Sequence, residues 1–282
     1  MVAATPSSAR VAWGTVRLTI VGCSGSFPGP DSAASCYLVE ADGFRLLVDL
    51  GSGALGAVQR YVSLYEIDAV CLSHLHADHC LDMCDYSVAR SFHPDGPRPP
   101  IPVYAPAGAA ERLGRALAAD PAAGAGPGRH ELGGITDTFS FATLTPGSME
   151  IGPLRVTAAH VNHPVETFGF RLEHAGRSLA YSADTGPTEA LVGLARDVDV
   201  LLCEASFLEP AGAGAPGAPP LPENLHLTGR QAGQHAARAG VGQLVLTHLV
   251  PWNDQGRTLD EASQAFSGPL SLAASGLGFT LE

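Results

Sequence analysis

The sequence predicts an α/β fold, with one domain built from two similar halves and one composite site at the ends of its strands. Short aliphatic runs alternate with helix-like segments along the 282 residues. Several of these runs end in polar segments, and in layered α/β folds such strand ends converge on ligands. The apolar share of 45% suits a substantial core.

The predicted strands form two series. The first covers 16–22, 35–41, 44–51 and 67–73, and the second covers 152–161, 168–173, 177–186, 198–206 and 243–249. Helices are predicted over 53–64, 188–196, 228–240 and 259–267, with Thr228 as the N-cap of the third. We therefore expect an N-terminal extension over 1–15 and one domain over 16–282, with halves at about 16–145 and 146–282.

Two stretches, 118–134 and 209–224, are rich in Ala, Gly and Pro and are predicted to be surface loops. The second lies between two candidate site residues, so a role as a lid stays open.

Charge and cysteine content narrow the class of protein. The net charge of −12, with 16 scattered basic residues, weighs against extended nucleic acid as a partner. The sequence has no membrane-length apolar run and no secretory signal, so a cytoplasmic protein is expected. The six cysteines are expected to be buried hydrophobes, with Cys80 and Cys84 on one face of a single helix. A homodimer is left open.

The segment "CLSHLHADHC" (71–80) follows a predicted buried strand and is the strongest chemical signal. Strand alternation points His74 and His76 the same way, and a turn then brings Asp78 and His79 to the same place. These are too many ligands for one zinc ion that also keeps an open position. They suit two ions that activate water against phosphoryl or acyl centres.

Further nitrogen and oxygen ligands follow downstream, each at or just beyond a strand end. The candidates are His160, His163, Asp184 and His248. Imidazole and carboxylate suffice for a centre that activates water, so the cysteines are not needed as ligands.

The H-x-H-x-D-H motif, a later His, an Asp in an S-x-D-T turn and a last His after an aliphatic strand resemble the metallo-β-lactamase superfamily. The resemblance implies an αββα four-layer sandwich, two mixed sheets with external helices. It implies two Zn²⁺ per chain, with Mn²⁺ or Fe²⁺ as alternatives. His163 is preferred to His160 because "HPVETFGF" resembles the family's third-histidine segment. The implied ligands are His74, His76 and His163 for one ion, Asp78, His79 and His248 for the other, and Asp184 as the bridge.

Two further segments, "LLCEASF" and "NLHLTG", resemble the tRNA 3′-processing endonuclease (RNase Z) branch. By that resemblance His226, held by Glu204, is the proton donor or shuttle. In the mechanism that we expect, Asp78 orients the attacking hydroxide while holding the second ion. The chain departs from those enzymes because neither Ala/Gly/Pro-rich loop contains lysine.

The run "IVGCSGSFPGPDSAASCYLVE" is similar to a branch of actinobacterial hydrolases that includes atypical class II cyclic-nucleotide phosphodiesterases. The resemblance implies a small anionic phosphodiester substrate such as 3′,5′-cAMP. Ser24, Gly25 and Ser26 are then expected at a strand-end turn, available to bind phosphate. An RNA 3′-endonuclease and a metal-binding regulatory protein without turnover are the alternatives.

Overall fold

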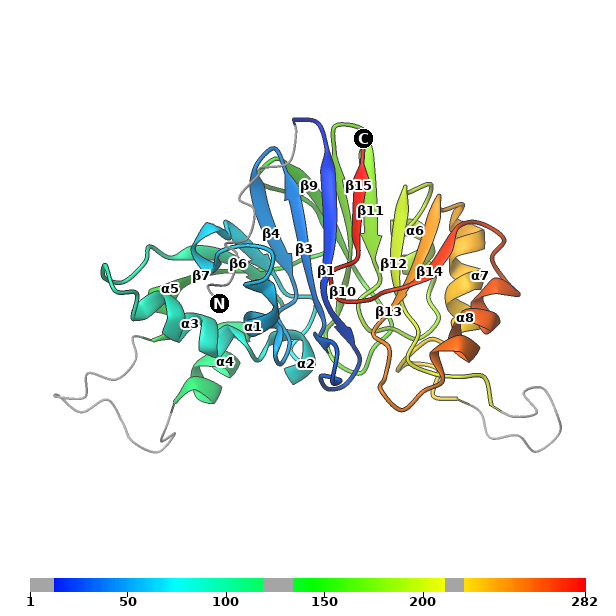
Figure 1. Cartoon of the computed structure of the whole chain (residues 1–282), viewed down its shortest axis with the longest axis horizontal. Helices are drawn as coiled ribbons and strands as arrows, with labels where there is room; N and C mark the ends of the chain where they lie inside the picture. The colour runs from blue at the N-terminus through cyan, green and yellow to red at the C-terminus, as the bar shows by residue number, and fades with distance from the viewer. Residues whose placement is uncertain (1–12, 119–133, 211–220) are drawn as a thin grey trace, which may run out of the picture.

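The computed structural model describes residues 13–118, 134–210 and 221–282. Most of the predicted extension 1–15 and of the predicted loops 118–134 and 209–224 lies outside these ranges, and so does the suggested lid. Two β-sheets pack face to face, with helices on the outer face of each (Figure 1). The predicted αββα arrangement is confirmed.

The first sheet has the strand order β15-β1-β3-β4-β5-β6-β7, with β2 paired to β1. It is mixed, because β1, β3 and β4 pair antiparallel while β4 to β7 run parallel. Its strands are β1 (Val16–Ser24), β2 (Ala33–Ala34), β3 (Cys36–Ala41), β4 (Phe44–Val48), β5 (Ala69–Cys71), β6 (Ile101–Ala105), β7 (Phe139–Thr143) and β15 (Gly278–Leu281).

The second sheet has the order β14-β13-β12-β11-β10-β9-β8. It is also mixed, with antiparallel pairs from β8 to β11 and parallel pairs from β11 to β14. Its strands are β8 (Gly147–Ile151), β9 (Leu154–His160), β10 (Phe168–His174), β11 (Arg177–Tyr181), β12 (Val200–Glu204), β13 (Gln243–Thr247) and β14 (Leu270–Leu272).

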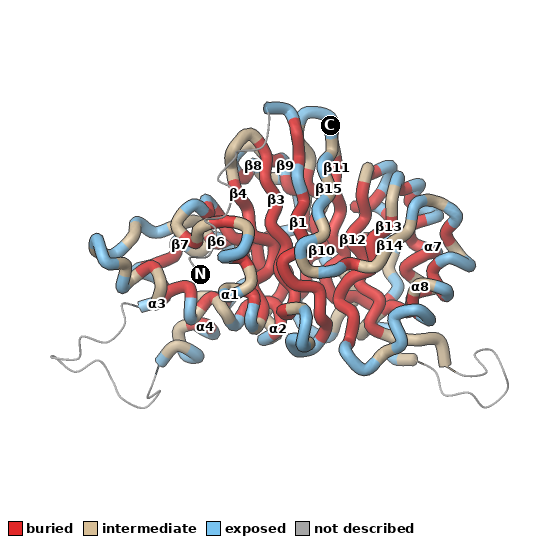
Figure 2. Tube along the Cα trace, in the orientation of Figure 1, coloured by how far each residue is buried: buried red, intermediate tan, exposed pale blue. Residues whose placement is uncertain are grey.

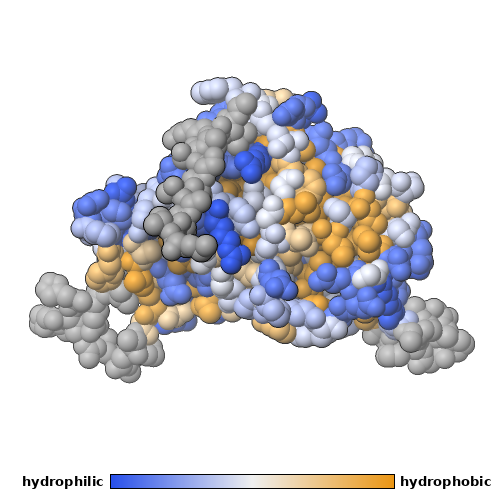
Figure 3. Space-filling view, viewed as in Figure 1, coloured by the Kyte–Doolittle hydropathy of each residue, from blue (hydrophilic) through white to orange (hydrophobic). Residues whose placement is uncertain are grey.

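The main core lies between the two sheets. Alternate residues of β1, such as Leu18 and Ile20, pack there with Phe168 and Phe170 of β10. Figure 2 shows buried residues running along the strands of both sheets, with exposed residues mainly in the connections and on the helices. Figure 3 shows hydrophobic residues gathered over the middle strands of this face, with hydrophilic residues toward its rims.

Helices cover the outer face of each sheet and bury a further apolar cluster there. The first sheet carries α1 (Ala54–Val58), η1 (Leu64–Glu66), α2 (Ala77–Cys80), α3 (Met83–Ser91), α4 (Ala109–Leu117) and α5 (Ile135–Thr138), and the second carries α6 (Glu189–Leu194), α7 (Gly229–Ala239) and α8 (Gln255–Ser263). None of the helices in the described ranges is long and apolar enough to cross a membrane.

Three expectations of local structure were wrong. The helix expected over 259–267 is α8, which begins four residues earlier because Asp254 caps its start, and which ends at Ser263. The helix expected over 53–64 ends at Val58 and is followed by turns, in which Arg60 N donates to Ala57 O and Tyr61 N donates to Val58 O. The backbone at Ser63 is extended, and its side chain accepts from Tyr65 N at the start of the 3-10 helix η1. Cys80 and Cys84 do not share a helix: Cys80 is the last residue of α2 and is fully buried, whereas Cys84 lies in α3 and is half-buried. The prediction that Thr228 caps α7 is confirmed, because Thr228 and Gln231 form a capping box.

Candidate metal centre

Strand ends from both sheets meet at the lower edge of the molecule in Figure 1. Hydrogen bonds join the two sheets at this edge. Phe168 N donates to Ser73 O over 3.0 Å, and Leu249 N donates to Cys23 O over 2.9 Å. The end of β1 and the segment that follows β5 are thereby fixed against β10 and the segment that follows β13, which brings residues far apart in sequence into one site.

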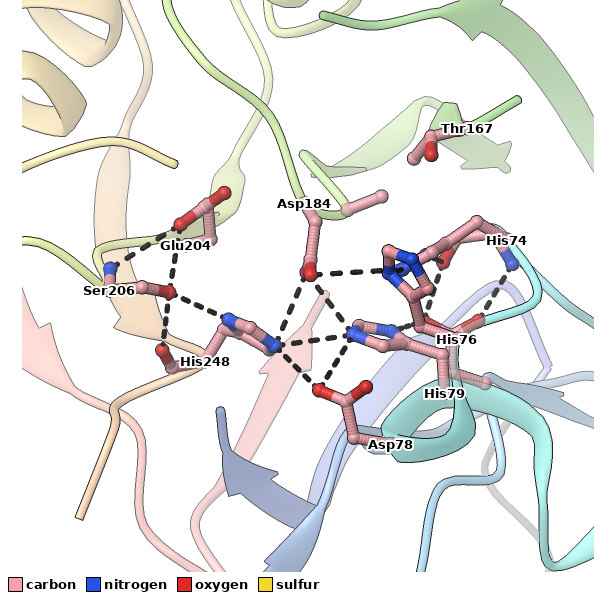
Figure 4. Close-up of polar contacts among 12 residues, drawn as sticks. His74, His76, Asp78, His79, Thr167, Asp184, Glu204, Ser206 and His248 are labelled. Atoms are coloured by element: carbon pink, nitrogen blue, oxygen red, sulfur yellow. Dashed lines mark hydrogen bonds and ion pairs between the residues drawn. The ribbon is translucent and has the colours of Figure 1, made fainter. Parts of the chain in front are cut away.

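The first group of candidate ligands is three histidines and one aspartate: His74, His76, His163 and Asp184, whose ligand atoms lie within 4.8 Å of one another. His76 Nδ1 lies 3.0 Å from His74 Nε2 and 3.3 Å from His163 Nε2. Figure 4 shows His74 and His76 side by side, with Asp184 directed toward them.

Hydrogen bonds fix the tautomers of two of these histidines. Ser73 Oγ gives its one proton to Asp49, so His74 must donate from Nδ1 to Ser73 Oγ. His163 donates from Nδ1 to the carbonyl of Leu225 over 3.0 Å. The Nε2 atoms of His74 and His163 therefore carry no proton, and the lone pair of each faces His76 Nδ1. One proton on His76 can satisfy only one of these two nitrogen atoms, so the ligand set fits a cation that both can bind.

The second group is Asp78, His79, Asp184 and His248, all buried. His248 Nε2 lies 3.1 Å from Asp78 Oδ2 and 3.2 Å from His79 Nε2. His79 donates from Nδ1 to Asp49, and His248 donates from Nδ1 to Ser206 Oγ, whose own proton is used on Glu204 or on the His248 carbonyl. Here too the Nε2 atoms are left to face the carboxylates (Figure 4).

Asp184 belongs to both groups and is fully buried. Its Oδ2 lies 3.7 Å from His74 Nε2, and its Oδ1 lies 3.2 Å from His79 Nε2 and 3.4 Å from His248 Nε2. Despite these short distances, Oδ1 has no hydrogen-bond partner of acceptable geometry. A buried carboxylate oxygen without a hydrogen bond costs free energy unless a cation binds it, so the residues fit a metal.

The first group is held neutral by its surroundings. Burial lowers the pKa of His74 well below its usual value, and burial also lowers the pKa of His76 and of His163. Neutral imidazole is the form that binds metal.

The second group holds ionised carboxylates. Burial alone would raise the pKa of Asp184, but His248 and His79 outweigh it and hold that pKa well below its usual value. The pKa of Asp78 is lowered too, because the hydrogen bond from His248 and the charge of His79 outweigh its burial. Asp184 and Asp49 in turn raise the pKa of His79 well above its usual value, against the effect of burial. The group thus demands positive charge, as a proton or as a metal ion.

Asp49 is a supporting residue that the sequence reasoning missed. It is fully buried and accepts from Ser73 N at 2.7 Å, Ser73 Oγ at 2.8 Å, His79 Nδ1 at 2.8 Å and Tyr181 OH at 2.9 Å. It thereby orients one histidine of each group, directly at His79 and through Ser73 at His74. The sequence signal was the polar segment "DLGSG" directly after a buried strand.

Strained backbone gathers at the same edge. Of the seven described residues other than glycine that have a left-handed backbone, four lie at this edge, with φ between 52° and 65°: Ser26, Asp49, Ala183 and His248. Each lies in or beside the two ligand groups. Such conformations cost free energy and are retained where the surrounding structure fixes a functional side chain.

Glu204 and His226 lie beside both groups. His226 Nδ1 lies 3.0 Å from Glu204 Oε1, and the His226 ring centroid is 5.7 Å from that of His163 and 5.4 Å from that of His248. Glu204 is fully buried at the end of β12. Burial would lower the pKa of His226, but Glu204 outweighs it and raises that pKa to about 9. The pair is a histidine oriented by a carboxylate, next to the candidate metals.

The turn over residues 24–26 supports the ligands. Ser26 N donates to Asp78 Oδ2 over 2.9 Å, and a Cβ on Gly25 would come within 2.6 Å of the carbonyl oxygen of His248. The Ser24 hydroxyl donates to Ser32 O within its own loop. Contact between this turn and a substrate phosphate stays a prediction.

The structure separates the two alternative third histidines. His163 joins the first group, whereas His160 is exposed at the end of β9 and its ring stacks on Phe168, with centroids 4.4 Å apart. The sequence preference for His163 agrees with this placement.

The fold and the site together define a class of protein. Residues 45–249 match the profile of the β-lactamase superfamily domain, so the chain belongs to that superfamily and has its metallo-β-lactamase fold. It is a metal-dependent hydrolase. The resemblance drawn from the H-x-H-x-D-H motif is thus confirmed at this level.

Three relatives illustrate the similarity. An uncharacterized protein of Mycobacterium tuberculosis is 43% identical over 91% of this chain and 89% of its own. The crystal structure of the metallo-β-lactamase fold protein YhfI from Bacillus subtilis superimposes with a TM-score of 0.77, at 26% identity, over 95% of this chain and 99% of its own. A Ribonuclease Z of Mycolicibacterium gilvum is 31% identical over 87% of this chain and 88% of its own.

Proposed function

We propose that the chain is a binuclear zinc-dependent phosphodiesterase that hydrolyses a small phosphodiester, a 3′,5′-cyclic nucleotide such as cAMP. The observation that carries the proposal is the Glu204–His226 pair beside two groups of metal ligands. A histidine oriented by a buried carboxylate is suited to protonating an alkoxide as it leaves phosphorus.

The ligand assignment follows the two groups. We assign His74, His76 and His163 to one ion, Asp78, His79 and His248 to the other, and Asp184 to both. When bound, two Zn²⁺ ions, or Mn²⁺ or Fe²⁺ in their place, act as Lewis acids that activate water and neutralise charge on the phosphoryl group.

The chain's own residues have separate tasks in this scheme. Asp78, held by Ser26 N, orients the attacking water while it binds the second ion. His226, held through Nδ1 by Glu204, delivers a proton from Nε2 to the leaving 3′-oxygen. Glu204 keeps its position because Thr185 N also donates to it over 2.6 Å.

Charge favours an anionic substrate at the centre. The positive charge of two divalent cations exceeds the negative charge of the two carboxylates in the ligand set. The loaded site would therefore attract a phosphodiester. The net charge of −12 over the whole chain opposes the approach of a long polyanion. A small phosphodiester is attracted by the positive charge of the metal centre and is little affected by the negative charge of the rest of the chain.

An RNA 3′-endonuclease is the second candidate, because the Mycolicibacterium gilvum relative at 31% identity is a Ribonuclease Z. The expectation that extended nucleic acid is an unlikely partner, which rests on net charge, is not supported by this comparison. Electrostatic repulsion over the whole chain does not prevent a local contact at a positively charged centre.

Side-by-side assays of the metal-loaded protein on cAMP and on a precursor tRNA test the two candidates. Hydrolysis of cAMP with the tRNA intact supports the proposal. Cleavage of the tRNA with cAMP untouched refutes it in favour of the endonuclease. Bound metal without hydrolysis of either substrate or of bis-p-nitrophenyl phosphate would identify a binding protein without turnover.

Variants test the assigned roles. Substituting His226→Ala should lower turnover by about 10²-fold or more, as expected for a lost general acid, with metal content unchanged; loss of metal would make His226 a ligand instead. His163→Ala should lose metal, whereas its matched control His160→Ala should keep it. Full metal retention by Asp184→Ala would contradict the bridging assignment.

A further inference from the structure

Two exposed aromatic side chains, Phe27 and Trp252, lie against each other near the metal centre. Phe27 is 44% exposed and Trp252 is 67% exposed, and their ring centroids are 5.2 Å apart at an interplanar angle of 40°. Exposing two large aromatic rings side by side is unfavourable in water, and such a pair indicates a binding surface.

The backbone of Phe27 is tied to the metal ligands. The preceding residue, Ser26, has a left-handed backbone and donates from its N–H to Asp78 Oδ2 over 2.9 Å. Phe27 N donates to the carbonyl of Gly25 over 2.8 Å, and Gly25 is packed against His248. The ring of Phe27 is therefore exposed on a loop whose position is fixed by two candidate ligands.

The backbone of Trp252 is fixed from the other side. Asn253 N donates to Val250 O over 3.1 Å, which closes a turn with Pro251 and Trp252 at its centre. Asn253 Nδ2 donates to Ser206 O over 2.7 Å, and the hydroxyl of Ser206 accepts from His248. Trp252 is thus held to the residue that orients His248.

The two loops are joined to each other as well. Gly25 N donates to Leu249 O over 3.1 Å, and Ser24 and Leu249 form a parallel bridge. Figure 1 shows the loops after β1 and β13 at the same lower edge as α2, which carries Asp78. The aromatic pair is therefore a rigid element at the rim of the metal centre, on the side of Asp78 and His248.

We propose that Phe27 and Trp252 form a stacking platform for the nucleobase of a substrate whose phosphate lies at the metal centre. The proposal rests on the proposed phosphodiesterase function and adds to it the two side chains that contact the base of the substrate. Stacking on aromatic rings tolerates any base, because every base presents a π-face, and the platform therefore binds purines and pyrimidines alike.

The size and rigidity of the pair favour a base over a second copy of the chain. A stable protein interface buries roughly 800 Å² on each partner, far more than two side chains provide. One flat base can stack on one of these rings and contact the other, which is tilted by 40°. A backbone fixed in advance lowers the entropy lost on binding.

Tryptophan fluorescence gives a direct test. The chain has two tryptophans, so Trp13→Phe leaves Trp252 as the only one. Metal-loaded protein of this variant is titrated with 5′-AMP and with ribose 5-phosphate, which has the same phosphate group and no base. AMP should change the emission of Trp252 and ribose 5-phosphate should not. AMP that binds by calorimetry without changing that emission would overturn the proposal.

Substitutions test the energetic contribution. In the Trp13→Phe background, Phe27→Ala should weaken AMP binding by about ten-fold, within the range expected for loss of one base–aromatic contact. The matched control is Phe92→Ala, which removes another exposed phenylalanine, 63% exposed, at the end of α3. Equal AMP affinity in the Phe27→Ala and Phe92→Ala variants would refute the platform.

Kinetics separate this proposal from the one it rests on. Trp252→Ala should raise KM for cAMP by about ten-fold, with a smaller effect on kcat, as for lost ground-state binding. If the wild-type protein leaves cAMP intact, the proposed activity is refuted. The AMP titration then still tests whether Phe27 and Trp252 bind a base. A wild-type protein that hydrolyses cAMP, with KM unchanged in Trp252→Ala, refutes the platform alone. If Trp252→Ala converts a dimer to a monomer and leaves AMP binding unchanged, the pair is an interface between copies, which also overturns the proposal.

Discussion

Replacing Asp49 by asparagine should weaken metal binding without removing any ligand. Asp49 accepts four hydrogen bonds, three of them at Oδ2 and one at Oδ1. An asparagine that places its oxygen at the Oδ2 position keeps three neutral bonds and turns its NH₂ group toward Ser73 N–H. Two donors then face each other in a fully buried site.

The magnitude follows from these contacts. Each bond to a carboxylate that becomes a bond to a neutral amide costs about 1 kcal/mol, and an unsatisfied buried N–H adds about 1–3 kcal/mol. We therefore expect the free energy of unfolding of the metal-free protein to fall by about 4–6 kcal/mol. Because Asp49 orients His79 and, through Ser73, His74, metal affinity should fall by about 10–100-fold.

Urea unfolding of the metal-free protein and competition with a chelator measure the two quantities. The matched control is Asp68→Asn, since Asp68 accepts one backbone bond from Arg45 N over 2.8 Å and lies at an exposed position. This control should lose about 1 kcal/mol or less and keep its metal affinity. Wild-type metal affinity in Asp49→Asn would refute the reasoning that histidine orientation depends on this carboxylate.

Three further predictions concern other parts of the fold. Gly51→Ala should lose metal, since its Cβ would come within 1.9 Å of the Asp78 carbonyl oxygen, whereas Gly56→Ala, with open space around it, should be neutral or stabilising; normal metal content in Gly51→Ala would contradict this. Thr228→Ala should cost about 1–2 kcal/mol in urea unfolding by removing the α7 cap. The cost should exceed that of Thr188→Ala, because the Thr228 hydroxyl also donates to Glu209 Oε1 over 2.6 Å, whereas Thr188 accepts a single bond from Ala190 N. Burial lowers the pKa of His235, which donates to Gln231 O and accepts from Thr188 N. The unfolded chain therefore takes up this proton first as the pH falls below about 6.5, and stability should drop there by up to about 1.4 kcal/mol per pH unit. The free energy of unfolding should therefore fall more steeply with falling pH in the wild type than in His235→Gln. Parallel plots of this free energy against pH for the two proteins would refute the prediction.

The sequence predicted the central strands of each sheet better than the edge strands. Strands such as β1, β4, β11 and β13 are short aliphatic runs, and their buried positions make the pattern visible. Strands β7 and β8 escaped notice because most of their residues are exposed or half-buried, so no apolar run marks them. Strand β15 has alternate exposed residues and is defined by its pairing with β1, more than 250 positions away, which no local pattern reveals.

The same contrast holds for the candidate site. Histidines and aspartates that could bind metal stand in a dense motif and at strand ends, and so were predictable. Asp49 was not, because its role depends on the parallel register of β4 and β5, which sets Val48 beside Cys71 and so brings Asp49 to Ser73. Phe27 and Trp252 lie 225 positions apart in sequence, and only the joined loops bring their rings together.

The pairing of β15 with β1 has a consequence for how the protein is made on the ribosome. Strand β1 leads directly into the turn that holds Asp78, yet one of its two edges is completed by Gly278–Leu281. Gly276 N also donates to Ile20 O, and Ile20 N donates to Leu277 O. During translation, this edge of the first sheet therefore stays unpaired until residues 276–281 have emerged. That edge is a template for mispairing with other nascent chains, and a fusion or truncation at residues 276–281 should reduce the yield of folded protein even though it lies far from the catalytic edge.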